Sequence, residues 1–212
     1  MRARGTDLIV QFLGRLGLAM YPAKDDYHYC PRTFGTSFHK LPDIRTLEPF
    51  GSLATKVIRE DRTTLYYDRL YVLYQAICNA ARLGLSAESM AEVGVYKGGG
   101  TYFIASTVQQ LFQARPAIYA FDTFEGHPDD IDPFLDGGHY SGAFSDTSFD
   151  DVKRYLSTFD NVVLCQGRFQ ERSDTITGLR FSFVHIDVDI FTATRNSLDF
   201  FADSMVPGGT II

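Results

Sequence analysis

Three ionisable side chains lie within FVHIDVDIF, residues 183–191, a stretch that otherwise has the composition of a buried strand. His185, Asp187 and Asp189 alternate with aliphatic residues, and the two-residue period of a strand would place all three on one face. Burying a carboxylate without a partner costs free energy. The pattern therefore predicts that these acids have a partner.

A second chemical pattern is the glycine-rich segment AEVGVYKGGGTYFIA, residues 91–105, which predicts a strand, a tight turn and a helix start with free amide groups. Its acid and glycines, Glu92, Gly94 and Gly98, have the spacing E-x-G-x-x-x-G. Dinucleotide-binding proteins use G-x-G-x-x-G instead, so the spacing argues against a nicotinamide dehydrogenase. A carboxylate here suits a ligand with a positive group, such as the sulfonium and ammonium of S-adenosylmethionine. A plain tight turn is the alternative.

Asp122 closes the next predicted strand, AIYAFD, residues 117–122. In nucleotide-binding parallel sheets, an acid at this place accepts hydrogen bonds from the ribose hydroxyls. Aspartate also caps the turn that follows a strand. The sequence leaves both roles open.

Alternating strands and helices must position these motifs. Helical spacing of apolar residues predicts a helix over 63–84. The further strands predicted are 89–95, 117–122, 161–167, 180–188 and one that begins at GGTII, 208–212. The further helices predicted are 101–114, 149–159 and 192–205. Strands separated by helices predict an α/β fold, a mostly parallel twisted sheet with helices on both faces.

The polar clusters of this sequence all fall at the carboxyl ends of predicted strands. They are Glu92 to Gly99, Asp122 to Glu125, Gln166 to Arg168 and Asp187 to Asp189. Ligands of open parallel sheets bind at this edge. The coincidence over four strands predicts a binding cleft.

The charge distribution bears on the partners of the protein. The chain has 212 residues, enough for one domain with a full core, and a net charge of -6. Between residues 122 and 151 it carries acids at 122, 125, 129, 130, 132, 136, 146, 150 and 151 and no Lys or Arg. Such a run argues against nucleic acid as a partner. It predicts either a solvated loop or a lid over the cleft.

Cysteine usage and the N-terminal segment bear on localisation. The three cysteines, Cys30, Cys78 and Cys165, are widely spaced, which indicates a reducing, cytoplasmic compartment. Residues 7–23 are apolar but short and are interrupted by polar residues, so we expect neither a membrane span nor a signal peptide. An amphipathic helix that covers the core or a partner subunit is the prediction, and a membrane-surface helix is the alternative.

Four segments together resemble the macrocin-type O-methyltransferases over residues 60–212. They are EVGVYKGGG, FDTFEG, GAFSDTSFDDVKRYL and FVHIDVDIFTATRNSLDFF. The resemblance implies a Rossmann-like class I methyltransferase that uses S-adenosylmethionine and Mg²⁺ to methylate a hydroxyl of a small molecule, most typically a sugar of a natural product. It implies an N-terminal cap over residues 1–55, a substrate lid or subunit contact in a homo-oligomer. Residues 56–212 would form the cofactor-binding domain.

The resemblance also implies roles for single residues. Glu92, Gly94 and Gly98 would line the methionine end of the cofactor, and Asp122 with Thr123 would hold the ribose. The positions expected to flank the adenine are Gln166, Gly167, Arg168 and Phe169.

The resemblance makes Asp187 the metal ligand, and a hard cation with oxygen ligands is then the partner that the buried acids require. Asp187 itself or His139 would take the proton of the acceptor hydroxyl. We expect His185 to be a buried structural histidine, and Asp189 either to support the metal ligand or to cap the following helix.

The sequence departs from the family pattern at its end. In the family two adjacent acids after the fifth strand complete the metal site, and further helix and strands follow, whereas this sequence stops at Ile212. We therefore expect the C-terminal strands and part of the metal site to be missing. Two alternative functions remain: a cofactor-binding but inactive relative, and a protein similar to the hydroxylase-associated proteins of cephamycin biosynthesis.

Overall fold

The computed structural model describes residues 44–132 and 134–212. The amphipathic helix expected at 7–23 lies outside these residues, as does most of the cap segment expected at 1–55. The described part begins with a short 3₁₀ helix, η2 (Ile44–Thr46), which leads into helix α2 (Phe50–Arg59).

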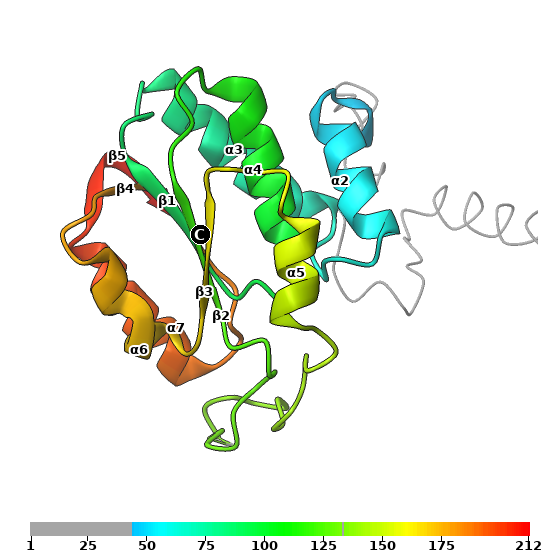
Figure 1. Ribbon diagram of the computed structural model, residues 1–212, viewed down its shortest axis with the longest axis vertical. Helices are drawn as coiled ribbons and strands as arrows, with labels where there is room; N and C mark the ends of the chain where they lie inside the picture. Colours follow the sequence, from blue (N-terminus) through cyan, green and yellow to red (C-terminus); the bar gives the residue numbers. More distant parts are fainter. Residues whose placement is uncertain (1–43, 133) are drawn as a thin grey trace, which may run out of the picture.

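A five-stranded parallel sheet forms the centre of the fold (Figure 1). Its strands are β1 (Ser89–Val93), β2 (Ile118–Asp122), β3 (Val162–Gln166), β4 (Phe181–Ile186) and β5 (Met205–Ile211). The order is β3-β2-β1-β4-β5. The chain adds β2 and β3 on one side of β1 and then β4 and β5 on its other side, so the strand order reverses between β1 and β4. The predicted α/β fold with a parallel sheet is confirmed. A switch point between β1 and β4 is where such sheets open a crevice for ligands.

Helices cover both faces of the sheet (Figure 1). On one face lie α2, α3 (Tyr67–Arg82), α4 (Gly99–Leu111) and α5 (Phe149–Tyr155). On the other lie α6 (Phe169–Arg172) and α7 (Phe191–Ala202), with a second 3₁₀ helix, η3 (Ser173–Ile176), between α6 and β4. The sequence pattern had not predicted α2, α6 or η3. The last two have only four residues each, too few to show a helical period.

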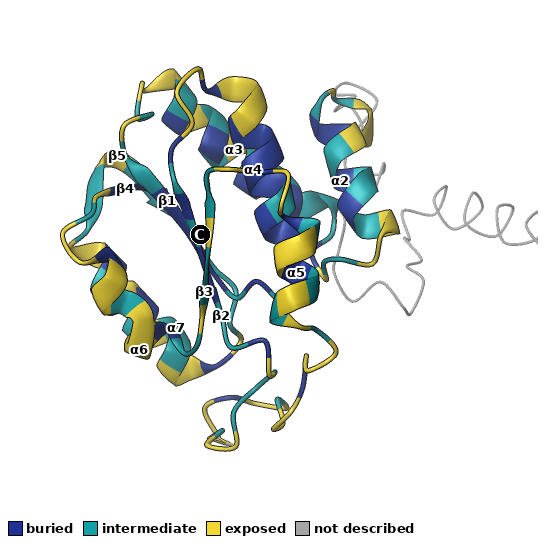
Figure 2. Ribbon diagram, viewed as in Figure 1, coloured by how far each residue is buried: buried dark blue, intermediate teal, exposed yellow. Residues whose placement is uncertain are grey.

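The two faces of the sheet carry separate hydrophobic clusters, because successive residues of a strand point to opposite sides (Figure 2). Met90 and Ile118 pack under α2, α3 and α4, in a cluster that includes Phe50 and Phe103. The neighbouring strand residues pack under α6 and α7. They are Ala91, Val93, Phe121 and Val184. Glu92 and His185 are the polar residues that share the face of the larger cluster, and both are buried.

The period-two pattern expected through Asp189 ends earlier than predicted. Strand β4 stops at Ile186, and the amide of Asp187 makes one last sheet-like hydrogen bond, to the carbonyl of Val93 at 2.8 Å. Asp189 then has a φ of 58°, a left-handed conformation that breaks the alternation. Asp187 and Asp189 therefore belong to the loop between β4 and α7.

Strand β5 begins at Met205, earlier than the GGTII start that the sequence predicted. Pro207, which has no amide hydrogen, hid this start from the pattern. The strand tolerates it because, in the described residues, β5 pairs with β4 alone and lies at the edge of the sheet.

The long loop between β2 and α5 extends from the carboxyl end of the sheet, at the bottom of Figure 1.

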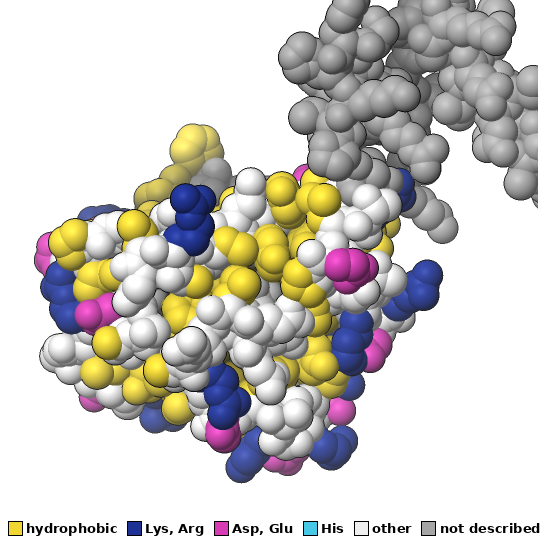
Figure 3. All heavy atoms as spheres, turned by 90° about the horizontal axis from the view of Figure 1, so that it is seen from above, with side chains coloured by type: hydrophobic (Ala, Val, Ile, Leu, Met, Phe, Trp, Pro, Cys, Tyr) yellow, Lys and Arg dark blue, Asp and Glu magenta, His cyan; other side chains and the backbone are white. Residues whose placement is uncertain are grey.

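The surface seen from above in Figure 3 is mixed in character. Hydrophobic side chains gather in its middle, and most charged side chains lie near its rim (Figure 3). Across residues 44–132 and 134–212, no helix has the length and apolar character required to cross a membrane.

Replacing Gly94 by alanine tests the close approach of β1 to the loop after β4. A Cβ here would lie 2.0 Å from the carbonyl oxygen of Asp187, and the backbone has a φ of +96°. We expect the variant to lose about 3 kcal/mol or more of unfolding free energy in chemical denaturation, from overpacking and backbone strain together. Gly84→Ala is the matched control, because Gly84 also has a positive φ, +71°, but has open space around it. Equal losses in the two variants would contradict the steric argument.

Candidate functional site

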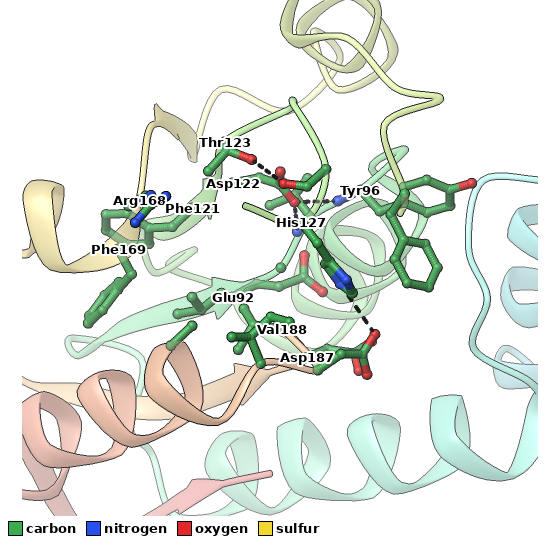
Figure 4. A pocket seen from close by; sticks show the side chains of 18 of the residues that line it. Glu92, Tyr96, Phe121, Asp122, Thr123, His127, Arg168, Phe169, Asp187 and Val188 are labelled. Carbon is green, nitrogen blue, oxygen red and sulfur yellow. Dashed lines mark hydrogen bonds and ion pairs between the residues drawn. The ribbon is translucent and has the colours of Figure 1, made fainter. Parts of the chain in front are cut away.

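A cleft opens at the carboxyl ends of β1, β2, β3 and β4, as the sequence predicted (Figure 4). The predicted site residues that line it are Glu92, Gly94, Asp122, Thr123, Gly167, Arg168, Phe169 and Asp187. Three others, Gly98, Gln166 and His139, are not among its lining residues. The segment 62–65, between α2 and α3, also lines the cleft, and nothing in its residue types had marked it.

Glu92 lies at the floor of the cleft with 1% of its surface exposed. The hydroxyl of Thr101 on α4 donates to its Oε2, and His185 Nδ1 on β4 lies 3.0 Å from its Oε1. Gly100 leaves room for this carboxylate, since a Cβ there would lie 2.3 Å from Oε1. The prediction that His185 is a buried structural histidine is confirmed. Burial would lower the pKa of His185, but the hydrogen bond and charge of Glu92 outweigh it and raise the pKa.

Asp122 holds the loops after β1 and β2 together. Its Oδ2 accepts hydrogen bonds from the amides of Val95 and Tyr96, at 2.7 and 2.8 Å, and its Oδ1 accepts from the amide of Phe124 at 2.7 Å. The turn-capping role that the sequence left open is therefore present. Each carboxylate oxygen has two lone pairs, so Oδ1 keeps room for one further donor from a ligand. The neighbouring Thr123 hydroxyl donates to the carbonyl of Gly126 at 3.3 Å.

The segment after β3 forms one wall of the cleft. Phe169 packs edge-on against Phe121, with ring centroids 5.1 Å apart. The guanidinium of Arg168 makes two hydrogen bonds to the carboxylate of Asp130, at 2.9 and 3.1 Å, which fasten the acidic loop to this wall. These contacts hold both side chains at the edge of the cleft. Gln166 is exposed, and its carbonyl accepts a hydrogen bond from Arg172 Nε.

Gly98 has a structural role away from the cleft. It precedes the first residue of α4 with a φ of 85°, in the left-handed conformation. A Cβ on it would lie 3.1 Å from the side chain of Val152 on α5. The glycine is thus explained by the turn and by the packing of α5.

Asp187 faces the cleft from the opposite wall, and it is the predicted metal ligand. Burial raises the pKa of its carboxyl, and the nearby Asp189 adds to the rise while His185 opposes it. The charge of Arg69 on α3 also lowers this pKa. A largely buried carboxylate whose charge is offset only in part by neighbouring cations is suited to a bound cation.

The acidic loop between β2 and α5 is anchored to the site by Asp136, a residue that the sequence had marked only as part of a charge run. Asp136 is 5% exposed. Its Oδ1 accepts a hydrogen bond from the amide of Phe191 at 2.6 Å, and its Oδ2 accepts from the amide of Asp132 at 2.9 Å. Asp136 therefore supplies the cap of α7, whose own N-cap residue is Ile190. The alternative in which Asp189 caps this helix is wrong.

His127 is a second residue of this loop for which the sequence pattern had predicted no role. It follows β2 directly after FDTFEG, and that position was the available signal. Its ring lines the cleft and lies 5.1 Å from the ring of His139, measured between centroids. Burial and the neighbouring His139 lower the pKa of His127. Its Nε2 lies 4.0 Å from Oδ2 of Asp189.

Comparisons with known proteins agree with this arrangement. Residues 61–212 match the sequence profile of the family described as Macrocin-O-methyltransferase (TylF). The solved structure of the O-methyltransferase NovP is 18% identical, with a TM-score of 0.59 over 71% of this chain and 65% of that chain. CalS11, a calicheamicin methyltransferase, is 14% identical, with a TM-score of 0.57 over 79% of this chain and 72% of that chain. The chain thus spans slightly less than two thirds of the length of NovP. No curated protein matches the sequence.

Replacing Asp122 by alanine should destabilise the fold as well as the site. The change leaves three backbone amides without their acceptor. We expect a loss of about 2–3 kcal/mol in unfolding free energy, measured by chemical denaturation, because partly buried donors lose charge-assisted hydrogen bonds. Asp129→Ala, in the exposed part of the acidic loop, is the control and should change stability by less than about 0.5 kcal/mol. A stable Asp122→Ala variant would show that the loops do not need this carboxylate.

Proposed function

Because this chain belongs to the macrocin O-methyltransferase (TylF) family, we propose that it transfers the methyl group of S-adenosylmethionine to a hydroxyl of a small molecule. One observation carries the proposal. A single cleft at the switch point of the sheet is lined by residues that follow β1, β2, β3 and β4. This is the edge at which open parallel sheets bind nucleotide-type ligands.

The cofactor would lie across these strand ends. Glu92 offers a buried negative charge to the methionine end, where the ammonium and sulfonium are positive. Asp122 Oδ1 and Thr123 would accept from the ribose hydroxyls. Gly167, Arg168 and Phe169 would flank the adenine, for which the ring of Phe169 offers an apolar surface.

Asp187 is the residue that would hold Mg²⁺, with Asp189 beside it. A carboxylate oxygen matches the preference of a hard cation, and the raised pKa of Asp187 reflects a charge that burial destabilises. Bound Mg²⁺ would lower the pKa of the acceptor hydroxyl. The metal requirement is part of the proposal.

The reaction would be a direct displacement. An acceptor oxygen forms a bond to the methyl carbon as the carbon–sulfur bond breaks, which leaves S-adenosylhomocysteine and transfers the hydroxyl proton to a base. We assign Asp187 as that base, because it lines the cleft and a carboxylate that gives one oxygen to a cation has a second oxygen that could accept the proton. His139, the other candidate base, does not line the cleft.

The acceptor that we propose is a hydroxyl on the sugar moiety of a natural product, as the family name suggests. His127, Pro128 and Phe144 from the acidic loop and the segment 62–65 line the cleft beside the cofactor positions, and they would contact the acceptor. We propose a cytoplasmic homo-oligomer that binds neither nucleic acid nor membrane. The net charge of -6 agrees with the absence of a nucleic-acid partner.

Calorimetric titration with S-adenosylmethionine and S-adenosylhomocysteine tests the cofactor assignment. We expect both to bind with a dissociation constant in the micromolar range, about −8 kcal/mol. Phe169→Leu, which keeps an apolar side chain in the core cluster, should weaken both by about 1 kcal/mol through loss of the ring surface, with circular dichroism to check that the variant is folded. Absence of binding to either compound would overturn the proposed function. Binding without methyl transfer to any hydroxylated acceptor would indicate an inactive relative.

Asp187→Asn tests the base and metal role. The variant should lose methyl transfer by at least about 100-fold, the contribution typical of a general base, while its affinity for S-adenosylhomocysteine stays within a few-fold of wild type. Wild-type activity should fall when Mg²⁺ is removed with EDTA. Activity that survives both the substitution and EDTA would contradict the assignment.

The same variant makes a prediction about stability and pH. The folded state raises the pKa of Asp187, so the protein loses stability as pH rises through that pKa and the buried carboxyl ionises. Without metal, Asp187→Asn should therefore melt at a higher temperature than wild type at pH 7. The difference should vanish only well below the pKa of an unfolded aspartate, about 3.9, where wild-type Asp187 is protonated in both states. The opposite trend, in which the stability of Asp187→Asn relative to wild type falls between pH 4 and pH 7, would show that the ionised carboxylate of the wild type is well compensated.

A further inference from the structure

The acidic loop and the loop after β4 bring together three groups at the side of the cleft where the acceptor would bind. They are His127, His139 and Asp189. Each offers one ligand atom, and these atoms all lie within 4.8 Å of one another. Two of the residues are on the loop between β2 and α5, and the third precedes α7. The cluster thus joins two separate segments of the chain.

The surroundings of His127 are unusual for a histidine without a ligand. Its side chain is only 9% exposed, and its Nδ1 is buried without a hydrogen-bond partner among the described residues. Its Nε2 lies 4.0 Å from Asp189, which is beyond hydrogen-bond distance. Burying an unpaired polar group costs about 1–3 kcal/mol, so the fold holds this ring in place beside Asp189 in spite of that cost.

The backbone holds the two histidines close together before any ligand binds. The amide of His127 donates to the carbonyl of Ala143 at 2.8 Å, and the carbonyl of His127 accepts from Gly142 at 2.9 Å. The amide of His139 donates to the main-chain carbonyl of Asp136 at 3.0 Å, and the side chain of Asp136 is the buried cap of α7. These bonds connect both histidines to the same anchored turn of the loop.

Two imidazoles and one carboxylate are a donor set typical of a divalent transition metal. Zn²⁺ binds imidazole nitrogen and carboxylate oxygen at about 2.0–2.2 Å, which places tetrahedral ligand atoms about 3.4 Å apart. The separations in the cluster, at most 4.8 Å, need to contract by up to about 1.4 Å, a movement within reach of side-chain rotation. Nitrogen ligands favour Zn²⁺ or Co²⁺ over Mg²⁺, which prefers oxygen.

We propose that His127, His139 and Asp189 form a site for a divalent transition metal of the Zn²⁺ class. Its ligands differ from that of the oxygen site proposed at Asp187, although Asp187, His127 and Asp189 line the same cleft. Binding of the ion can be measured without methyl transfer. A bound ion would join the acidic loop to the segment that precedes α7. The Arg168–Asp130 contact fastens the same loop to the wall formed by the segment after β3.

Titration of the untagged full chain with Co²⁺ and with Zn²⁺ tests this site. We expect about one equivalent of Co²⁺ to produce visible ligand-field absorption bands, Zn²⁺ to displace them, and a thousand-fold excess of Mg²⁺ to leave them in place. His139→Gln and Asp189→Asn, both away from the core, should weaken Zn²⁺ affinity in calorimetry by at least about 10–100-fold. Circular dichroism checks that both variants are folded.

Two control variants locate the ion. His39→Gln removes a histidine that is not one of the three proposed ligands, and Asp187→Asn removes the acid of the proposed oxygen site. Both should keep the Co²⁺ spectrum and the Zn²⁺ affinity of wild type. The proposal is overturned if wild type binds no Zn²⁺, if His139→Gln and Asp189→Asn bind it as tightly as wild type, or if Asp187→Asn loses the spectrum. Binding of S-adenosylmethionine is measured separately, so failure of this site leaves the proposed function untouched.

Discussion

The carboxylate of Asp122 is the interaction on which the cleft depends. A parallel sheet brings the ends of its strands to one edge, but the loops that leave those ends expose unpaired amides. Asp122 accepts from three of them, two after β1 and one after β2, and so fixes the turn that leads into α4. The position of α4 in turn allows Thr101 to reach Glu92. One side chain thus orders both loops that would hold the cofactor.

The negative charges at the floor and at one wall of the cleft are compensated to different extents. Glu92 is compensated by Thr101 and by His185, whose pKa rises in response, so this acid is stable in the unliganded protein. The charges of His185 and Arg69 compensate Asp187 only in part, and its pKa rises because burial destabilises its ionised form. The floor is therefore organised before a ligand arrives, whereas the Asp187 wall gains stability when a cation or a proton neutralises it. This difference separates a positioning role from a reactive one.

Much of the fold could be predicted from the sequence, because strand and helix periods, glycine turns and strand-end acids are local signals. The five strands, their parallel arrangement and the cleft are examples. The misses have physical reasons. Strand β4 stops at Ile186 because Asp189 adopts a left-handed backbone, and no period-two pattern reports such a change. Gly98 has the right spacing for a ligand contact, yet the packing of α5 explains it. His127 and Asp136 acquire their roles only when a long loop folds back.

The cap of α7 comes from the loop between β2 and α5, through Asp136. Within the described residues, the first turn of this helix and the ordering of that loop are therefore a single cooperative unit. A loop exchanged with that of a relative, in order to alter which acceptor fits, would remove the cap along with the lining residues. Successful grafts would need either to carry an acid equivalent to Asp136 or to place a serine or aspartate at Ile190, where the helix could cap itself. By the same reasoning, the stability of α7 would constrain changes of the proposed acceptor, although only Thr192 and Ala193 of this helix line the cleft.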